Sequence, residues 1–304
     1  MEIKYYSELK AKEQFSVLQY LGFRQALDYR TFDLRRELDY RFSGGPGGIC
    51  ALIDNKLAGF VGLMQIPTKT IMGNELVGGV WCVVTNPDYW GKGICSTLMG
   101  KAHEYFVERG CRFCFLSTSK GLISYNLYKK LGYEEISYFQ GFPKVFKFSK
   151  IKKERINNLS SIDIKQANVL FREFAKTFTG FVIRPSDFID FQQWNGRYED
   201  QVSVQCEGGY ALVSHNSGHL VIEEFISINE IATTKILKSL ENKSDGLLID
   251  PLVSCEGHKK IYQKRDYIFE QSQNFVFMVK PLDTKATFIE SYGDGFYINS
   301  LSLF

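Results

Sequence analysis

The short segment over residues 86–96 constrains the fold of this chain more than any other part of its sequence. It reads NPDYWGKGICS, follows an apolar and β-prone run over residues 80–84, and leads directly into a helical pattern over residues 97–107. A helix that begins after a strand and a glycine-bearing loop exposes N–H groups with no partner inside the helix, and its dipole favours negative charge there. Gly91 and Gly93 carry no Cβ, so the backbone can come close to a ligand. The segment therefore predicts a binding site for a phosphate group.

Two common phosphate-binding loops do not fit this spacing. A Walker loop has four residues between its glycines, whereas only Lys92 separates Gly91 from Gly93. A dinucleotide-binding fingerprint has a further glycine three residues after the second one, where this chain has Ser96. An ordinary strand–turn–helix corner that binds no ligand is the alternative interpretation of this segment alone.

The segment resembles the pyrophosphate loop of the GNAT family, the acetyl-CoA-dependent N-acetyltransferases. The matching positions are Pro87, Tyr89, Gly91, Lys92, Gly93, Ile94 and Ser96. Trp90 stands where the family usually has Arg or Gln, and Cys95 where it usually has Gly or Ala. The resemblance implies acetyl-CoA as the co-substrate, with its pyrophosphate held by Gly91, Lys92, Gly93, Ile94, Cys95 and Ser96. Lys92 either adds positive charge at this site or faces the solvent.

A second motif downstream resembles the same family. Residues 127–133 read LYKKLGY and end a short helical pattern, with Gly132 placed as its C-cap. They are similar to the family's L-Y-x-K-x-G-F/Y segment, and the family's usual Asn and Ala upstream of the tyrosine are here Gly121 and Ser124. The resemblance implies that Tyr128 is the general acid that protonates the departing CoA thiolate, which suits a phenol with a pKa of about 10. A tyrosine that only packs on an amphipathic helix is the alternative.

The resemblance also implies a reaction, direct acyl transfer to an amine. In the family, the strand before the loop splays from its neighbour and binds the pantetheine arm through backbone groups, which here belong to Val83, Val84 and Thr85. The expected acceptor is a primary amine of a small molecule or peptide. No general base is identifiable; Glu75 and Glu104 are candidates by chemistry alone, and ordered water is the alternative. A non-catalytic acyl-CoA-binding or scaffold module, and a transferase that uses a longer acyl donor, are the competing functions.

The length of 304 residues predicts two domains. The order of expected strands and helices over residues 1–150 is that of the acetyltransferase fold, an α+β or α/β fold with a mixed, mostly antiparallel sheet flanked by helices. Residues 151–304 repeat this order in a smaller form, and residues 261–267 parallel residues 127–133. No glycine loop precedes the second domain's helix at Asn229. We therefore expect a catalytic first domain and a degenerate second one, with an unrelated α+β domain as the alternative.

This tandem arrangement resembles two-domain acetyltransferases of the enhanced intracellular survival type. In that type, the terminal carboxylate of the chain reaches the active site and acts as a base. The resemblance extends that role to the carboxylate of Phe304, near Tyr128. A tail strand that completes the core of the second domain is the alternative.

Composition argues against several other classes of protein. The apolar content of 44% suffices for packed cores. No run of eighteen apolar residues and no signal-peptide pattern is present, so we expect no membrane partner and a cytoplasmic location. The net charge of +3 is too small to predict nucleic-acid binding. Seven cysteines, an odd number, and four histidines without metal-site spacing predict free thiols and no metal. The oligomeric state stays open, with a homodimer as one option.

Overall fold

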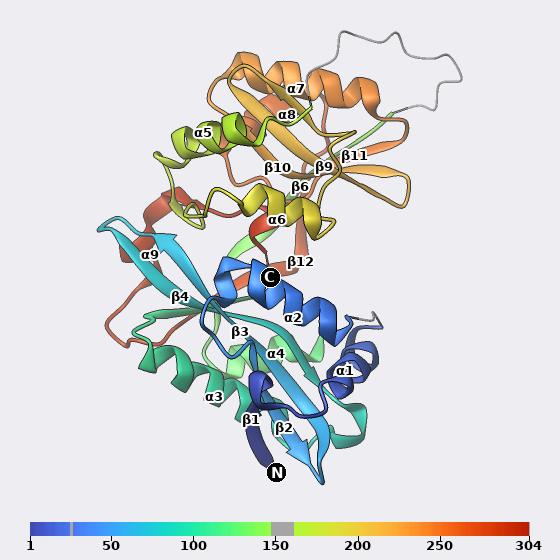
Figure 1. Cartoon of the computed structure of the whole chain (residues 1–304). Coiled ribbons are helices and arrows are strands. Elements are labelled where there is room, and N and C mark those ends of the chain that lie inside the picture. The colour runs from blue at the N-terminus through green and yellow to red at the C-terminus, as the bar shows by residue number, and fades with distance from the viewer. Residues whose placement is uncertain (25–26, 147–160, 304) are drawn as a thin grey trace. The chain divides into compact units, whose positions relative to one another are not determined.

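The computed structural model describes residues 1–24, 27–146 and 161–303, and its contacts divide the chain into two compact units (Figure 1). Unit 1 comprises residues 1–137 and 274–291, and unit 2 comprises residues 138–273 and 292–303. Each unit therefore contains segments from two separate parts of the chain. The domain boundary expected between residues 150 and 151 lies outside the described residues, and so does Phe304.

Unit 1 is built on one mixed sheet (Figure 1). Its helices are α1 (Glu13–Phe23), α2 (Tyr29–Leu38), α3 (Ile94–Glu108) and α4 (Ile123–Lys130), and α9 (Phe288–Tyr292) follows the last strand. Its strands are β1 (Glu2–Tyr5), β2 (Gly48–Ile53), β3 (Lys56–Lys69), β4 (Asn74–Thr85), β5 (Phe113–Ser119) and the end of β12 (Glu270–Pro281). They pair in the order β1-β2-β3-β4-β5-β12, and only β4 and β5 run parallel.

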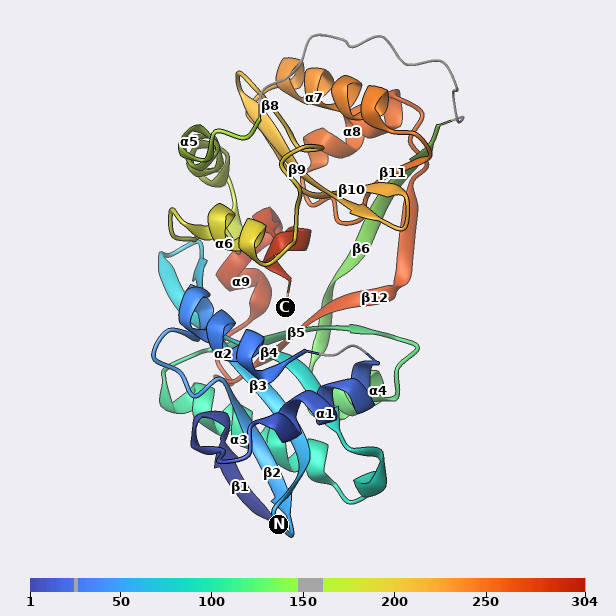
Figure 2. The same ribbon diagram turned by 45° about the vertical axis from the view of Figure 1, so that its right-hand side comes forward.

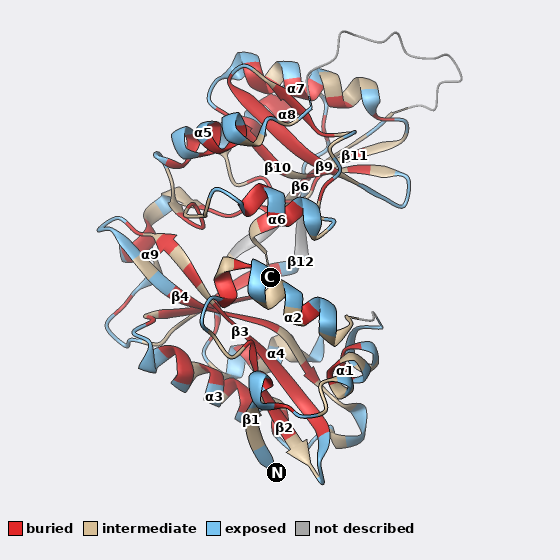
Figure 3. Cartoon of the chain, viewed as in Figure 1, coloured by how far each residue is buried: buried red, intermediate tan, exposed pale blue. Residues whose placement is uncertain are grey.

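The two faces of this sheet pack against different helices, because successive side chains of a strand point to opposite sides. On β3, Phe60 points to the side of α1 and α2, where its ring centroid lies 4.9 Å from that of Phe15 and 6.1 Å from that of Phe32. The next residue, Val61, packs in another core cluster with Ile94 of α3. Figures 1 and 2 show α1 and α2 on one face and α3 on the other. Between them, β2 and β3 are mostly buried (Figure 3).

Two strands, β6 (Glu134–Val145) and β12, each begin in one unit and end in the other. The end of β12, Phe275–Pro281, pairs antiparallel with β5 in unit 1. The end of β6, Phe142–Val145, pairs antiparallel with β11 (Leu247–Asp250) in unit 2. Each unit's sheet is therefore completed by a strand that starts in the other unit.

This exchange differs from the strands that the sequence predicts. The sequence suggests two strands, over residues 134–138 and 144–148, that both complete the first unit; residues 147 and 148 lie outside the described residues. The structure has the single strand β6 instead. The position beside β5 belongs to β12, whose Val276 and Met278 are fully buried in the core cluster of unit 1. Strand propensity alone does not specify which sheet a strand joins, and the core contacts decide it.

Unit 2 repeats the pairing pattern of unit 1. Its helices are α5 (Ile164–Ala175), α6 (Phe188–Trp194), α7 (Glu230–Lys243) and α8 (Glu256–Lys264). Its sheet contains β8 (Val204–Cys206), β9 (Gly209–Asn216), β10 (His219–Ser227), β11 and the end of β6, while β7 (Thr179–Gly180) pairs with β13 (Phe296–Tyr297). The strands pair in the order β8-β9-β10-β11-β6, and of these pairs only β10 and β11 run parallel. The order β2-β3-β4-β5-β12 of unit 1 has its one parallel pair, β4 and β5, at the same place. The expected architecture, repeated in a second and smaller form, is confirmed.

All seven cysteines are free thiols, so each unit is stabilised by hydrogen bonds and packing without disulfides. In the part of the chain that the structure describes, no helix has both the length and the apolar character that crossing a bilayer requires.

Unit 2 buries the carboxyl group of Asp250 at the end of β11. Its side chain accepts a hydrogen bond from the Tyr262 hydroxyl at 2.8 Å and one from the Leu252 backbone N–H at 3.3 Å. Burial raises the pKa of Asp250 to about 7, and the two hydrogen bonds only partly oppose this shift. The carboxyl is therefore neutral below about pH 7, and above that pH the fold must hold a buried charge.

We expect Asp250→Asn to change the pH dependence of stability. The pKa is raised from 3.8 to about 7 in the folded state, so the folded state keeps a proton that the unfolded state releases. The contribution of this carboxyl to the free energy of unfolding is thus fully present below about pH 4 and declines as the pH rises through about 7. The variant should gain stability relative to the parent over that range, as measured by urea unfolding at about pH 5 and about pH 8.

The matched control is Asp245→Asn, which removes an exposed carboxyl just before the same strand. Its free energy of unfolding should follow the parent's pH profile. If the profile of Asp250→Asn also ran parallel to the parent's, the buried carboxyl would not titrate as expected.

Candidate functional site

The parallel strands β4 and β5 separate soon after they meet. They pair only at Gly78 with Cys114 and at Gly79 with Phe115 among the described residues. On its other side, β4 bulges away from β3: Phe60 pairs with Val84 but Gly62 pairs with Trp81, so that two residues of β4 lie opposite one residue of β3. The end of β4 therefore presents its backbone to an opening between the strands.

The bulge has a backbone cause. Cys82, the first of the two bulge residues on β4, has a φ of 48°, in the left-handed region that non-glycine residues rarely adopt. Such bulges bend a strand and re-aim its end, and they are frequent beside functional sites. Val83, the second bulge residue, and Val84 after it lie on opposite faces of the sheet. Val83 packs against the core cluster that contains Ile94 of α3, while Val84 contacts α1 at Gly22.

The loop after β4 leaves the N-terminus of α3 open. Gly91 and Gly93 have φ values of 75° and 74°, and Gly93 is the N-cap residue without a side-chain cap. Within the described residues, the backbone N–H groups of residues 91–96 have no hydrogen-bond partner. A Cβ added at either glycine would meet nothing within 4 Å, so steric crowding does not explain the glycines. The left-handed φ is what favours glycine at both positions. The open N–H groups and the dipole of this 15-residue helix form an anion site.

A cavity of about 700 Å³ connects this anion site to the end of β4. It is lined by the end of α1, the end of β4, the loop, and the first turns of α3 and α4. The lining residues are Gly22, Phe23, Val83, Val84, Thr85, Tyr89, Trp90, Gly91, Gly93, Ile94, Cys95, Ser96, Gly121, Leu122, Ile123, Ser124 and Leu127. No Asp, Glu, Lys, Arg or His occurs among these described lining residues. The volume lies within the range of small-molecule sites.

The structure brings most of the sequence-predicted cofactor residues to this one cavity. Those that line it are Val83, Val84, Thr85, Gly91, Gly93, Ile94, Cys95 and Ser96. Lys92 is not in the lining; its ammonium lies 4.8 Å from the centre of the Tyr89 ring. Its charge therefore stabilises the loop through a cation–π contact.

Tyr128 lies behind the cavity wall. It is 5% exposed, packs in the α3-side core, and its ring centroid lies 5.9 Å from that of Tyr133. Burial raises the pKa of Tyr128, the nearby Cys95 raises it further, and a hydrogen bond from Ser124 opposes the shift. Ser124 and Leu127, on the same helix, line the cavity. The phenol therefore stays protonated at neutral pH. Ser124 both lines the cavity and forms a hydrogen bond with Tyr128.

Cys95 also borders this region. Burial raises the pKa of its thiol to about 11, so the thiol stays protonated at neutral pH. A protonated thiol is a poor nucleophile. Cys95 therefore serves as a small side chain in the first turn of α3.

Trp90 folds back onto the end of β4. Its indole Nε1 donates a hydrogen bond to the carbonyl of Thr85 at 2.9 Å, while the ring is 64% exposed and lines the cavity. The loop position that departs most from the family pattern thus forms a wall of the cavity and satisfies a backbone acceptor of β4.

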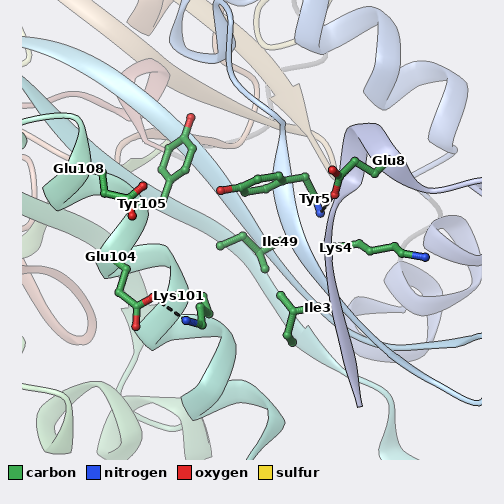
Figure 4. Close-up of a pocket in the computed structure, with 9 residues that line it drawn as sticks. All are labelled: Ile3, Lys4, Tyr5, Glu8, Ile49, Lys101, Glu104, Tyr105 and Glu108. Carbon is green, nitrogen blue, oxygen red and sulfur yellow. Dashed lines mark hydrogen bonds and ion pairs between the residues drawn. The ribbon is translucent and has the colours of Figure 1, made fainter.

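The two carboxylates considered as bases lie elsewhere. Glu75 is near the start of β4 and accepts a hydrogen bond from Arg112 at 2.8 Å. Ten residues separate it from Thr85, about 33 Å along a strand. Glu104 on α3 pairs with Lys101 at 2.6 Å and lines a separate cavity of about 290 Å³ between α3 and β1 (Figure 4). Neither carboxylate reaches the larger cavity.

Sequence reasoning missed the contribution of α1. Gly22 and Phe23 end α1, sixty residues before the end of β4, and no motif marks them. The signal that the sequence offers is a large apolar residue at a helix end, where solvent exposure is expected. In the structure, Phe23 is 46% exposed. Leu122 and Ile123 carry the same signal at the start of α4, where they are 55% and 88% exposed.

Unit 2 has a similar opening between strands but a different helix start. β10 and β11 pair only at Leu220 with Leu248 and at Val221 with Ile249 among the described residues. The N-cap of α7 is Asn229, whose side chain accepts a hydrogen bond from the Ala232 backbone N–H at 2.8 Å. This cap occupies a donor of the kind that a phosphate would need.

The opening in unit 2 is also filled. The cavity there measures about 10 Å³, the size of one water molecule. Glu224 beside it is held by Arg184 at 2.6 Å, Tyr210 at 2.5 Å and Asn299 at 2.6 Å. Unit 1 therefore holds the candidate site.

Comparisons with known proteins agree with this geometry. The sequence profile of the acetyltransferase (GNAT) family matches residues 13–133. A GCN5-related N-acetyltransferase from Kribbella flavida has a similar fold, with a TM-score of 0.68 and 15% identity over 93% of this chain and 71% of that chain. Eis1 from Mycobacterium abscessus gives a TM-score of 0.65 and 13% identity over 94% and 75% of the two chains. A putative acetyltransferase from Pyrococcus horikoshii gives a TM-score of 0.58 and 14% identity over 98% and 94%. No curated protein sequence matches.

We expect Gly93→Ala to weaken CoA binding sharply. An alanine at a φ of 74° costs about 1–2 kcal/mol, and relief of this strain would move the N–H groups that open the anion site. Isothermal titration calorimetry with CoA should show the loss, and thermal unfolding should show a modest fall in stability.

The matched control is Gly110→Ala, at the other end of α3. Gly110 has a φ of 72° and open space around its Cβ position, so the backbone cost is the same. It should lower stability without changing CoA binding. Equal binding losses in both variants would mean that strain, and not the anion site, causes them.

Proposed function

The chain belongs to the GNAT acetyltransferase family through residues 13–133, and we propose that it is an acetyl-CoA-dependent N-acetyltransferase. The proposed reaction moves an acetyl group to a primary amine of a small molecule or peptide. One observation carries the proposal: a single cavity joins the open N-terminus of α3 to the free edge at the end of β4. The seven free cysteines fit a reducing compartment, and a cytoplasmic location is part of the proposal.

The residues present suit a CoA thioester. The open N–H groups of residues 91–96 would hold the pyrophosphate. Because Gly91 and Gly93 have no Cβ, the pyrophosphate can approach the backbone closely there. The free edge of β4 at residues 83–85 would hold the pantetheine arm through backbone hydrogen bonds. When bound, acetyl-CoA supplies an acetyl group that is activated as a thioester.

The protein's own contribution is orientation and one proton. A bond forms between the amine nitrogen and the acetyl carbon, and the carbon–sulfur bond breaks. Tyr128, kept protonated by burial, gives its proton to the sulfur, directly or through Ser124. The nitrogen gives up a proton in the same reaction, so the phenol regains the proton that it lost. Fixing the two reactants together in the cavity can supply about 7–11 kcal/mol of the barrier reduction.

Two other functions have specific support. The hydrogen bond from Trp90 to the Thr85 carbonyl occupies a backbone acceptor on the edge that would bind pantetheine, which favours a weak-binding or scaffold module. The apolar cavity favours a transferase for a longer acyl donor. Calorimetry with acetyl-CoA and thiol release from acetyl-CoA and octanoyl-CoA separate these functions from the proposed one.

We expect Tyr128→Phe to lower turnover while acetyl-CoA binding stays near that of the parent. General acid catalysis contributes about 10²–10⁴-fold, so the loss of kcat should fall in that range. Thiol release measures kcat, and calorimetry measures binding. Unchanged turnover would remove Tyr128 from the acid role and leave it as a packing residue.

Tyr125→Phe is the matched control on the same helix. Its hydroxyl donates a hydrogen bond to Glu135, so the variant loses a hydroxyl of equal size outside the cavity lining. Turnover of this variant should match that of the parent. A loss equal to that of Tyr128→Phe would instead indicate a general disturbance of α4.

A further inference from the structure

Four large apolar side chains line the cavity although each is substantially exposed. They are Phe23 at 46%, Trp90 at 64%, Leu122 at 55% and Ile123 at 88%. Single exposed apolar residues are ordinary on protein surfaces, but a group that lines one cavity marks a site for an apolar ligand. The phosphates and amides of the cofactor need polar partners, so the groups that can contact these side chains are the apolar parts of the cofactor and an apolar acceptor.

The cavity has one end on each face of the sheet. The anion site belongs to α3, which packs on the face of Val61, whereas Phe23 belongs to α1, which packs on the face of Phe60. At the α1 end, a Cβ on Gly22 would come within 2.3 Å of a Val84 methyl, so α1 lies directly against the end of β4. A CoA thioester that enters from the α3 end leaves the α1 end for the acceptor.

Trp90 contributes its ring and not its polar atom to the cavity. The only polar atom of the indole, Nε1, is already bonded to the Thr85 carbonyl at 2.9 Å. The hydrogen bond fixes the ring at the end of β4 and leaves an apolar surface toward the cavity. Phe23 offers the same kind of surface from α1.

The described lining of the cavity is poorly suited to one class of acceptor. A polyamine or a lysine-rich peptide keeps further ammonium groups while one amine reacts, and such groups need carboxylates when they leave water. None of the described lining residues is Asp or Glu. An uncharged, apolar cavity also lowers the pKa of an entering amine by desolvation, which favours the neutral form that attacks.

We propose that the acceptor is a primary monoamine with an apolar substituent, and that Phe23 and Trp90 bind this substituent. The inference rests on the proposed acetyltransferase function and names its substrate class. Phe23 and Trp90 are then the residues that determine acceptor specificity.

The test is a series of linear alkylamines from ethylamine to hexylamine, with 2-phenylethylamine and spermidine, at saturating acetyl-CoA. The linear amines have similar pKa values, so the reactive fraction stays constant along the series. The value of kcat/KM from thiol release should rise about three- to fourfold for each methylene that the cavity buries. Spermidine should react more slowly than hexylamine.

Variants locate the binding surface. Phe23→Ala and Trp90→Ala should each flatten the dependence of kcat/KM on chain length, expressed relative to ethylamine. Trp90→Phe keeps an aromatic wall without the indole N–H, so it should keep most of the dependence. Trp194→Ala in α6 and Val107→Ala on α3 remove exposed apolar side chains outside the cavity, and the parent's dependence should persist in both.

Each other outcome has a distinct meaning. A flat series, or spermidine as the best acceptor, overturns the inference and leaves the proposed function standing. Chain-length dependence that persists in both alanine variants places the apolar surface elsewhere and also overturns it. A rise with acyl-CoA length instead of amine length assigns the cavity to a longer donor. Absence of thiol release with every amine overturns the proposed function, and the inference with it.

Discussion

The close packing of α3 on the sheet is the constraint on which the site depends. A Cβ at Gly59 would lie 2.7 Å from an Ile94 methyl, and one at Gly78 would lie 2.5 Å from the Phe106 ring. These two strand glycines let both ends of α3 approach β3 and β4 more closely than any other residue would allow. The first turn of α3 is thereby held at the point where β4 leaves β5. Its unpaired N–H groups and the free edge of β4 then face one cavity.

The two units show how a small change at a helix start alters what a fold can bind. Both have a parallel strand pair that separates after two residue pairs. In unit 1 the helix that follows begins at an uncapped Gly93, whereas in unit 2 it begins at Asn229, which caps itself. The opening of unit 2 holds Glu224 and Arg184, a buried ion pair whose charges satisfy each other. Removing one partner of such a pair would leave an unpaired buried charge and destabilise the fold. This polar cluster therefore contributes to the structure of unit 2.

The sequence predicts local features well and long-range ones poorly. Strand, loop and helix around Gly91 and Gly93 follow from glycine geometry and periodicity, and the structure has them at those positions. The exchange of β6 and β12 does not follow, because apolar alternation is the same whichever sheet a strand joins. Phe23 also escapes prediction, since its place beside β4 depends on how α1 crosses the sheet. The sequence names Tyr128, but only packing reveals that it is buried behind Ser124 and Leu127.

The buried phenol and the uncharged cavity are two consequences of one environment. Low polarity raises the pKa of Tyr128, because it disfavours the phenolate, and it lowers the pKa of an amine, because it disfavours the ammonium. In the proposed reaction, the acid is therefore kept protonated and the amine is driven to its neutral form without a carboxylate among the described lining residues. An added carboxylate would bind the ammonium and stabilise the form that cannot attack. In the proposed reaction, the amine releases its first proton to water as it enters, and the described lining holds no Asp or Glu that would retain this proton.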